Sequence, residues 1–151
     1  MRVAVAVDHG GFSLKQVILD EISKTGSQPI DLGAYTDIPA DDYPDYAQML
    51  GHAIRAGEAE RGVLVCGSGV GACIAVNKIP GIYAAIAHDV YSAAQGVQHD
   101  NMNVLCLGAR VIGDDVARTL VAAFLGATFS TEERHRRRVG KTRQIEAAAL
   151  V

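Results

Sequence analysis

Tryptophan is absent from this 151-residue chain, and aromatic residues of all kinds make up only 5% of it. Proteins that bind single-stranded nucleic acid usually stack bases on aromatic side chains, and duplex-binding proteins carry excess positive charge. Here the formal net charge is −3. We therefore expect neither nucleic acid nor an anionic membrane surface as a partner.

Cysteine is also scarce. Cys66, Cys73 and Cys106 form neither an even set for disulfides nor a CxxC pair for zinc, which favours a reducing compartment. Charged residues interrupt residues 1–25, so a signal peptide or spanning helix is not expected. The sequence thus predicts a cytoplasmic protein with a single domain over residues 1–151, large enough to bury a core without staples.

Short apolar runs alternate with amphipathic stretches along the whole chain. The runs predict strands at residues 2–7, 29–32, 63–66, 82–87 and 104–107. Nearly continuous apolar strands are typical of a parallel sheet covered on both faces. We expect an α/β, Rossmann-like, doubly wound domain with about five parallel strands, helices on both faces, and an Arg-rich C-terminal helix that opens near Ser130 with a capping-box pattern.

The motif Cys66-Gly-Ser-Gly-Val-Gly71 lies between a predicted strand and a helix. Glycines let the backbone turn sharply, so that successive N–H groups and the helix N-terminus can hold an anion. Cys66 and Ser68 place a thiol and a hydroxyl beside these donors, and a helix N-terminus favours a thiolate. The motif predicts a base and a pocket for negative charge in one loop. Cys73 and Cys106 are expected to be core residues.

Other polar residues follow strands at the same edge of the predicted sheet. Asp8-His9 follows the first strand, His88-Asp89 the fourth and Arg110 the fifth. Ligands of doubly wound sheets bind beyond these carboxyl ends. Asp89 equally suits the N-cap of the next helix.

Two further segments are candidates for binding. The loop at residues 33–44 is longer than typical strand-to-helix connections. Arg134, Arg138 and Lys141 lie at i, i+4 and i+7, on one helix face where they could converge on a dianion. Arg136 points elsewhere and is expected to be solvated, as is Arg137.

Two other kinds of site fit parts of the pattern. Asp–His neighbours can bind metal, but the chain has no HxxxH or HExxH motif, and we expect no metal. Gly67–Ala72 fits the dinucleotide pattern GxGxxA, and Asp89 could bind a ribose about twenty residues later. That interpretation leaves Cys66 and the arginine face unused. A noncatalytic nucleotide or phosphosugar-binding module remains an alternative.

Several stretches together resemble the ribose-5-phosphate isomerase B family and its relatives that act on galactose 6-phosphate and allose 6-phosphate. They are Asp8–Lys15, Asp42–Ala47, Cys66–Gly71 with Ala75–Lys78, His99 with Asn103-Val104, Gly108–Arg110, and Arg134-His135 with Arg138-Val139. The resemblance covers nearly the whole chain. It implies a homodimer, or a dimer of dimers, that isomerises a sugar phosphate without metal, nucleotide or other cofactor.

The resemblance also implies catalytic roles. Cys66 would move a proton between C1 and C2 of the sugar, His99 would help to open the ring, and Asp8 would contact substrate hydroxyls. The Ser68 hydroxyl would hold the enediolate oxygens together with backbone N–H groups. These N–H groups belong to the loop residues Gly67, Gly69, Val70 and Gly71.

Substrate-binding roles follow in the same way. His9, Arg134 and Arg138 match phosphate ligands, and Arg110 and Asp100 match further substrate-binding positions. The resemblance thus implies a phosphate subsite formed by residues from both ends of the chain.

Two positions depart from the common family pattern. Ser68 replaces a frequent Thr, which keeps the hydroxyl, and Asp100 replaces a frequent Asn, which could repel a phosphosugar or raise the pKa of His99. Cys66 favours the ribose 5-phosphate branch, since galactose 6-phosphate isomerase subunits generally lack that cysteine. We expect interconversion of ribose 5-phosphate and ribulose 5-phosphate, with allose 6-phosphate or erythrose 4-phosphate as alternative substrates.

Overall fold

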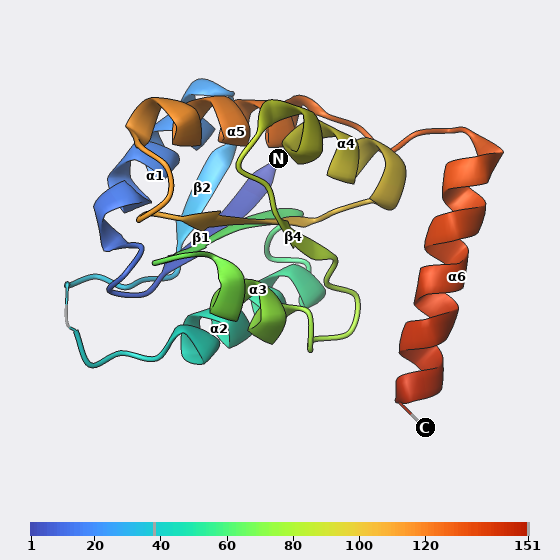
Figure 1. The fold of residues 1–151 in the computed structure, drawn as a ribbon, viewed down its shortest axis with the longest axis horizontal. Helices are drawn as coiled ribbons and strands as arrows, with labels where there is room; N and C mark the ends of the chain where they lie inside the picture. The colour runs from blue at the N-terminus through green and yellow to red at the C-terminus, as the bar shows by residue number, and fades with distance from the viewer. Residues whose placement is uncertain (38, 151) are drawn as a thin grey trace.

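A computed structural model describes residues 1–37 and 39–150. Its strands form one parallel sheet in the order β2-β1-β3-β5-β4 (Figure 1). The strands are β1 (Arg2–Val7), β2 (Gln28–Asp31), β3 (Arg61–Cys66), β4 (Ala84–Ile86) and β5 (Val104–Gly108). The predicted fold class is confirmed.

Helices cover both faces of the sheet, with α1, α4 and α5 on one side and α2 and α3 on the other (Figure 1). Their bounds are η1 (Phe12–Leu14), α1 (Lys15–Lys24), α2 (Tyr43–Arg55), α3 (Val70–Val76), α4 (Val90–Asp100), α5 (Asp114–Gly126) and α6 (Glu133–Ala149). Strand β1 is apolar from Val3 to Val7 because Val3 and Val5 pack in one core and Ala4 and Ala6 in the other. None of the helices described is long and apolar enough to cross a membrane.

The order of strands brings the ends of β1 and β3 together. Strand β1 pairs with β2 on one side and with β3 on the other, and Val7 lies opposite Val65. The Asp8 N–H donates to the Val65 carbonyl at 3.3 Å. Since the chain leaves these neighbouring strands in different directions, a crevice forms between the loops that follow them.

Several element boundaries differ from the predicted ones by one to three residues. Strand β4 spans Ala84–Ile86 rather than 82–87, because the Ile82 N–H is used in a turn to Ile79 and the Tyr83 N–H donates to the Asn103 side chain. Helix α6 begins at Glu133 rather than near Ser130, whose hydroxyl accepts from the Glu132 N–H at 3.0 Å. The expected capping box is therefore wrong.

Helix α6 stands beside the sheet layers and packs mainly on α4 (Figure 1). Its buried residues are His135 and Val139. Near its C-terminal end, Glu146 accepts hydrogen bonds from the Gly81 N–H at 2.8 Å and from the Tyr83 hydroxyl at 3.3 Å. The helix is thus attached near both ends.

Candidate active site

A cavity of about 310 Å³ opens at the carboxyl ends of β1, β3 and β5. It brings together seven of the predicted site residues with three residues that carry no predicted role. The lining consists of Asp8, His9, Gly10, Tyr43, Cys66, Gly67, Ser68, Gly71, Arg110 and Val111. The edge of the sheet predicted to carry the site is therefore the edge that forms this cavity.

Cys66 is the last residue of β3, and 5% of it is exposed. The Gly69 N–H donates to its Sγ at 3.1 Å, an interaction that strengthens when the sulfur is a thiolate. Gly69 has a φ of 84°, and a Cβ there would lie 3.1 Å from the carbonyl carbon of Leu107. Glycine is therefore required at this turn. Ser68 is exposed, and its hydroxyl accepts from the Val70 N–H at 3.2 Å.

Arg110 lies over the glycine loop. A Cβ on Gly67 would be 3.2 Å from the guanidinium carbon of Arg110, so the absence of a side chain makes room for this group. The Arg110 N–H also donates to the Gly67 carbonyl at 2.9 Å. The loop after β5 thus brings a positive charge against the loop that contains Cys66.

Asp8 and His9 occupy the neighbouring wall. Asp8 is 5% exposed, and its Oδ1 accepts from the Gly11 N–H at 3.0 Å. Burial raises the pKa of Asp8, and the hydrogen bond from Gly11 only partly opposes this. The ring of His9 is held by Asp41, which raises the pKa of His9 by accepting a hydrogen bond from Nδ1.

Tyr43 on the cavity wall and Asp41 behind His9 were given no role from the sequence, although the length of the 33–44 loop and, for Tyr43, the family-like stretch Asp42–Ala47 pointed to this segment. The Tyr43 ring fills the space left by Gly71, where a Cβ would lie 2.7 Å from the ring. Asp8, His9 and Asp41 also offer ligand atoms within 4.8 Å of one another. However, His9 Nδ1 and Asp41 Oδ1 are only 2.5 Å apart, which indicates a hydrogen bond rather than two ligands with an ion between them.

The remaining predicted residues lie elsewhere in the same chain. Asp100 and Arg138 line a second cavity of about 340 Å³, bounded by α4, α6 and β4. Arg134 pairs with Glu132, with Nε and Oε2 2.7 Å apart. Lys141 is exposed and does not line this cavity with Arg138. Within one chain, the arginines of α6 therefore do not meet His9.

His99 has two neighbours that sequence motifs did not reveal. Its ring stacks on that of His135, and its Nδ1 lies 2.9 Å from the Gln95 amide nitrogen. Because the NH₂ group of the Gln95 amide faces His99, it donates and Nδ1 accepts. A neutral His99 therefore carries its proton on Nε2. Gln95 also lies 3.5 Å from the Asp100 carboxylate. The i, i+4 spacing of Gln95 and His99 was the available signal.

The pair His88-Asp89 serves the fold. The Asp89 carboxylate caps α4 by accepting from the Ser92 N–H at 2.8 Å, which confirms the N-cap alternative over a ribose-binding acid. His88 accepts from the Gly108 N–H at 3.0 Å through Nε2. It lines a different cavity from that of Cys66, which leaves it outside the candidate site.

The other two cysteines differ from one another. Cys106 is fully buried as expected, and the Cys73 thiol, together with burial, raises its pKa well above the usual range. Cys73 is only half-buried, because it lies on the side of α3 toward β4, where its thiol approaches the Ala84 carbonyl. The neighbouring Cys106 thiol lowers the pKa of Cys73 to about 7, and Cys73 packs against the core from its margin rather than lying fully inside it.

A cavity with a thiol, a glycine loop and cationic groups, at the switch point of a doubly wound sheet, defines a site for a small anionic ligand. Residues 3–142 match the model of the family described as "Ribose/Galactose Isomerase". The chain belongs to this family.

Three proteins illustrate the relationship. Ribose-5-phosphate isomerase B of Escherichia coli is 40% identical over 96% of each chain. D-erythrulose-4-phosphate isomerase of Pectobacterium atrosepticum is also 40% identical, over 85% of each chain. The crystal structure of ribose-5-phosphate isomerase B from Mycoplasma genitalium with bound ribulose-5-phosphate superposes with a TM-score of 0.90, at 37% identity, covering 97% of this chain and 96% of that one.

Proposed function

We propose that the protein interconverts ribose 5-phosphate and ribulose 5-phosphate through an enediolate, with Cys66 as the proton-transfer base. The observation that carries this proposal is the Cys66 thiol beside the glycine loop, in a cavity shared with Asp8, His9 and Arg110. Its volume of about 310 Å³ is at the small end of ligand pockets and suits a pentose phosphate better than a dinucleotide.

In the proposed step, the Cys66 thiolate removes the C2 proton of the open-chain aldose, and the electron pair becomes the C1–C2 double bond as the carbonyl oxygen gains negative charge. The same sulfur returns the proton to C1, while the hydroxyl proton moves from O2 to O1. The backbone N–H groups of Gly67–Gly71 and the Ser68 hydroxyl stabilise the developing oxyanion. Arg110 adds positive charge over this loop.

His99 is proposed to open the sugar ring as a proton donor. Its hydrogen bond with Gln95 leaves Nε2–H available for donation. Because His99, Arg134 and Arg138 lie away from His9 in the same chain, we propose that a second copy supplies them, so that each complete site contains residues of both subunits.

Exposed apolar side chains support this homodimer, or a dimer of dimers. Ile145 on α6 is 72% exposed, Tyr91 on α4 74%, and Ile74 on α3 59%. The cavity between α6, α4 and β4 adds apolar lining from residues 83–87 to this region. A second copy that covered these side chains would bury apolar area and stabilise the pair.

Mixing two variants of strongly reduced activity tests this arrangement. Cys66→Ala and Arg138→Ala lack residues that belong to opposite halves of the proposed composite site. Co-refolded subunits should recover about a quarter of wild-type activity, because half of the dimers carry both chains and each of these has one intact site. A mixture that stays at the average of the two variants contradicts a site shared between subunits.

The substrate is tested by turnover on ribose 5-phosphate, erythrose 4-phosphate and allose 6-phosphate, with NADH binding measured in parallel. We expect the highest kcat/KM for ribose 5-phosphate. An erythrose 4-phosphate preference is the second candidate, since the Pectobacterium relative is named for the isomerisation of erythrulose 4-phosphate. Binding of phosphosugar without turnover would indicate a noncatalytic module instead. We place the reaction in the pentose phosphate pathway of the cytoplasm.

A further inference from the structure

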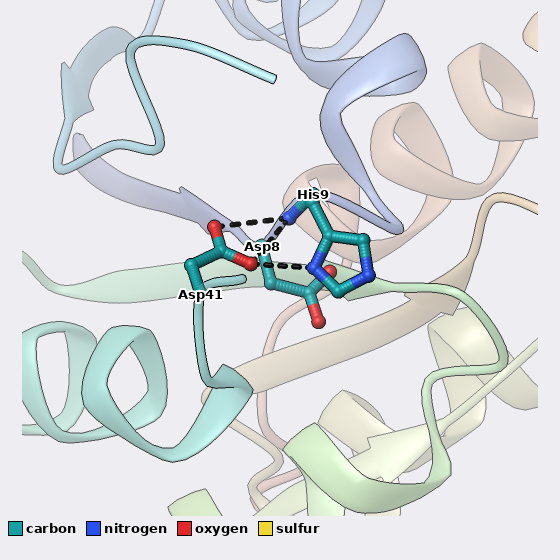
Figure 2. A group of neighbouring side chains, drawn as sticks. All are labelled: Asp8, His9 and Asp41. Carbon is teal, nitrogen blue, oxygen red and sulfur yellow. Dashed lines mark hydrogen bonds and ion pairs between the residues drawn. The ribbon is translucent and has the colours of Figure 1, made fainter. Parts of the chain in front are cut away.

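Asp41 reaches from the loop between β2 and α2 to the residue pair that follows β1 (Figure 2). Its two carboxylate oxygens accept from the His9 backbone N–H at 3.0 and 3.1 Å. Its Oδ1 also lies 2.5 Å from Nδ1 of the His9 ring. One carboxylate thus holds both the main chain and the side chain of His9.

The contact determines which ring nitrogen is free. Nδ1 donates to Asp41, and Nε2 lies on the opposite side of the ring from this carboxylate (Figure 2). His9 lines the cavity, whereas Asp41 does not. The imidazole therefore stands between the carboxylate and the space where the substrate would bind, with one N–H available to an anionic ligand.

We propose that Asp41 is a positioning residue that holds His9 as an imidazolium, with Nε2–H directed at the substrate phosphate. This inference rests on the proposed function, in which His9 binds the phosphate. A charged donor binds a phosphate oxygen about twice as strongly as a neutral one, so the charge on His9 matters as much as its orientation. Asp41 would act through His9 without touching the substrate.

The surrounding groups on balance favour the protonated form of His9. The hydrogen bond with Asp41 is the largest influence and raises the pKa of His9; Asp8 raises it further, while burial and Arg110 lower it. Burial alone would raise the pKa of Asp41, but hydrogen bonds from His9 and Tyr46 lower it overall. Cys66 and Tyr43 are the other titratable groups of the cavity wall. Ionised Asp41 and protonated His9 thus coexist between these two pKa values.

The direct test is an NMR titration of His9 in the ligand-free protein. Asp41→Asn removes the negative charge with little change in shape, and Asp37→Asn is the matched control, since Asp37 is an exposed acid in the same loop. We expect the pKa of His9 to fall in Asp41→Asn and to stay at the wild-type value in Asp37→Asn. An unchanged His9 pKa in Asp41→Asn overturns the proposal.

Kinetics then show whether the charge serves phosphate binding. For ribose 5-phosphate, Asp41→Asn should lower kcat/KM by about tenfold to a hundredfold, mainly through KM, at a pH between the His9 pKa values that NMR gives for the two proteins, and by less at a pH below both, where His9 is protonated in each. Turnover of unphosphorylated ribose should scarcely change. An equal loss at both pH values, or on both sugars, overturns the proposal and assigns Asp41 to the fold.

A double-mutant cycle keeps the test valid if Asp41→Asn also weakens the loop. In a His9→Asn background, Asp41→Asn should cause no further loss, since its effect passes through His9. Additive losses overturn the proposal. A titration with inorganic phosphate, followed by the NMR signal of His9, tests the role of Asp41 separately from the proposed isomerase function. If ribose 5-phosphate proves not to be a substrate, weaker phosphate binding in Asp41→Asn still supports the positioning role of Asp41, and equal binding overturns it.

Discussion

The imidazole rings of His99 and His135 stack, with their centroids 4.0 Å apart and their planes 22° from parallel. The stack joins the C-terminal end of α4 to the first turn of α6. His135 is 2% exposed, and its Nδ1 has no hydrogen-bond partner among the described residues. The position of α6 therefore depends on a buried histidine that is held in its neutral form.

This pair predicts an acid-sensitive attachment of α6. Burial, followed by the nearby His99, lowers the pKa of His135. The unfolded chain then binds a proton more readily than the folded one, so stability should fall as the pH drops below the ordinary histidine value of about 6.5. His135→Phe keeps a stacked ring without the proton, and we expect its Tm to vary less between pH 7 and pH 5 than that of the wild type. An unchanged acid slope in this variant would contradict the role of His135.

A second prediction concerns Cys66 as the base. Cys66→Ala should bind ribose 5-phosphate but lose nearly all turnover, because general base catalysis contributes about 100- to 10,000-fold. More than about a tenth of wild-type kcat in this variant excludes the role.

Alkylation of Cys66 should inactivate the enzyme, with protection by substrate. The pKa of Cys73 is lowered to about 7, so this thiol will also react with iodoacetamide at neutral pH. The experiment therefore needs a Cys73→Ser background. Substrate protection that disappears in this background would show that the protected thiol was Cys73 and not Cys66.

A third prediction separates the arginines of α6. Arg134→Ala and Arg138→Ala should each lower kcat/KM for ribose 5-phosphate by roughly tenfold to 150-fold, the loss expected for one charge-assisted hydrogen bond, and should scarcely change turnover of ribose. The exposed neighbour Arg136 is the matched control, and Arg136→Ala should behave as wild type. Equal losses on both sugars would mean that the helix supports the fold and that the phosphate is bound elsewhere.

A fourth prediction concerns Arg61, which acts at the end of α5. Its guanidinium donates to the Phe124 carbonyl and, at 2.8 Å, to the Ala127 carbonyl, and it lies 5.3 Å from the Phe124 ring. Arg61→Met keeps the aliphatic stem but leaves these carbonyls without donors, at a cost of about 2 kcal/mol. For a chain of this length, Tm should fall by about 4–8 °C. Arg61→Lys should recover part of the loss, and a Met variant as stable as wild type would contradict the capping role.

Much of the fold follows from local patterns in the sequence. Strand β1 is apolar from Val3 to Val7 because both of its faces are buried there, and that property can be read without knowing the neighbouring strands. The Cys66 loop was predictable for the same reason, since its glycines follow a buried strand directly. The strand that was predicted too long, β4, begins late because the Tyr83 N–H donates to the side chain of Asn103 from another segment.

The missed parts of the site depend on tertiary contacts. The contact of Asp41 with His9 joins residues 32 positions apart, and no spacing rule relates them. The family resemblance assigns both His9 and the arginines of α6 to the phosphate subsite. In one chain they lie apart, because α6 packs on α4 rather than over β1. Sequence patterns identify such residues but do not determine how they are assembled.

Glu146 fixes the position of the C-terminal part of α6, which in a terminal helix would otherwise be free to move. It lies eight residues beyond Arg138, about 12 Å along the helix axis, and its carboxylate is fastened to Gly81 and Tyr83. The stack of His135 on His99 holds the other end of α6. The helix is therefore held at two points, and Arg138 lies between them. Without the Glu146 contacts, α6 would be free to rotate about the His99–His135 stack. The orientation of Arg138 therefore depends on a carboxylate two turns away along the helix.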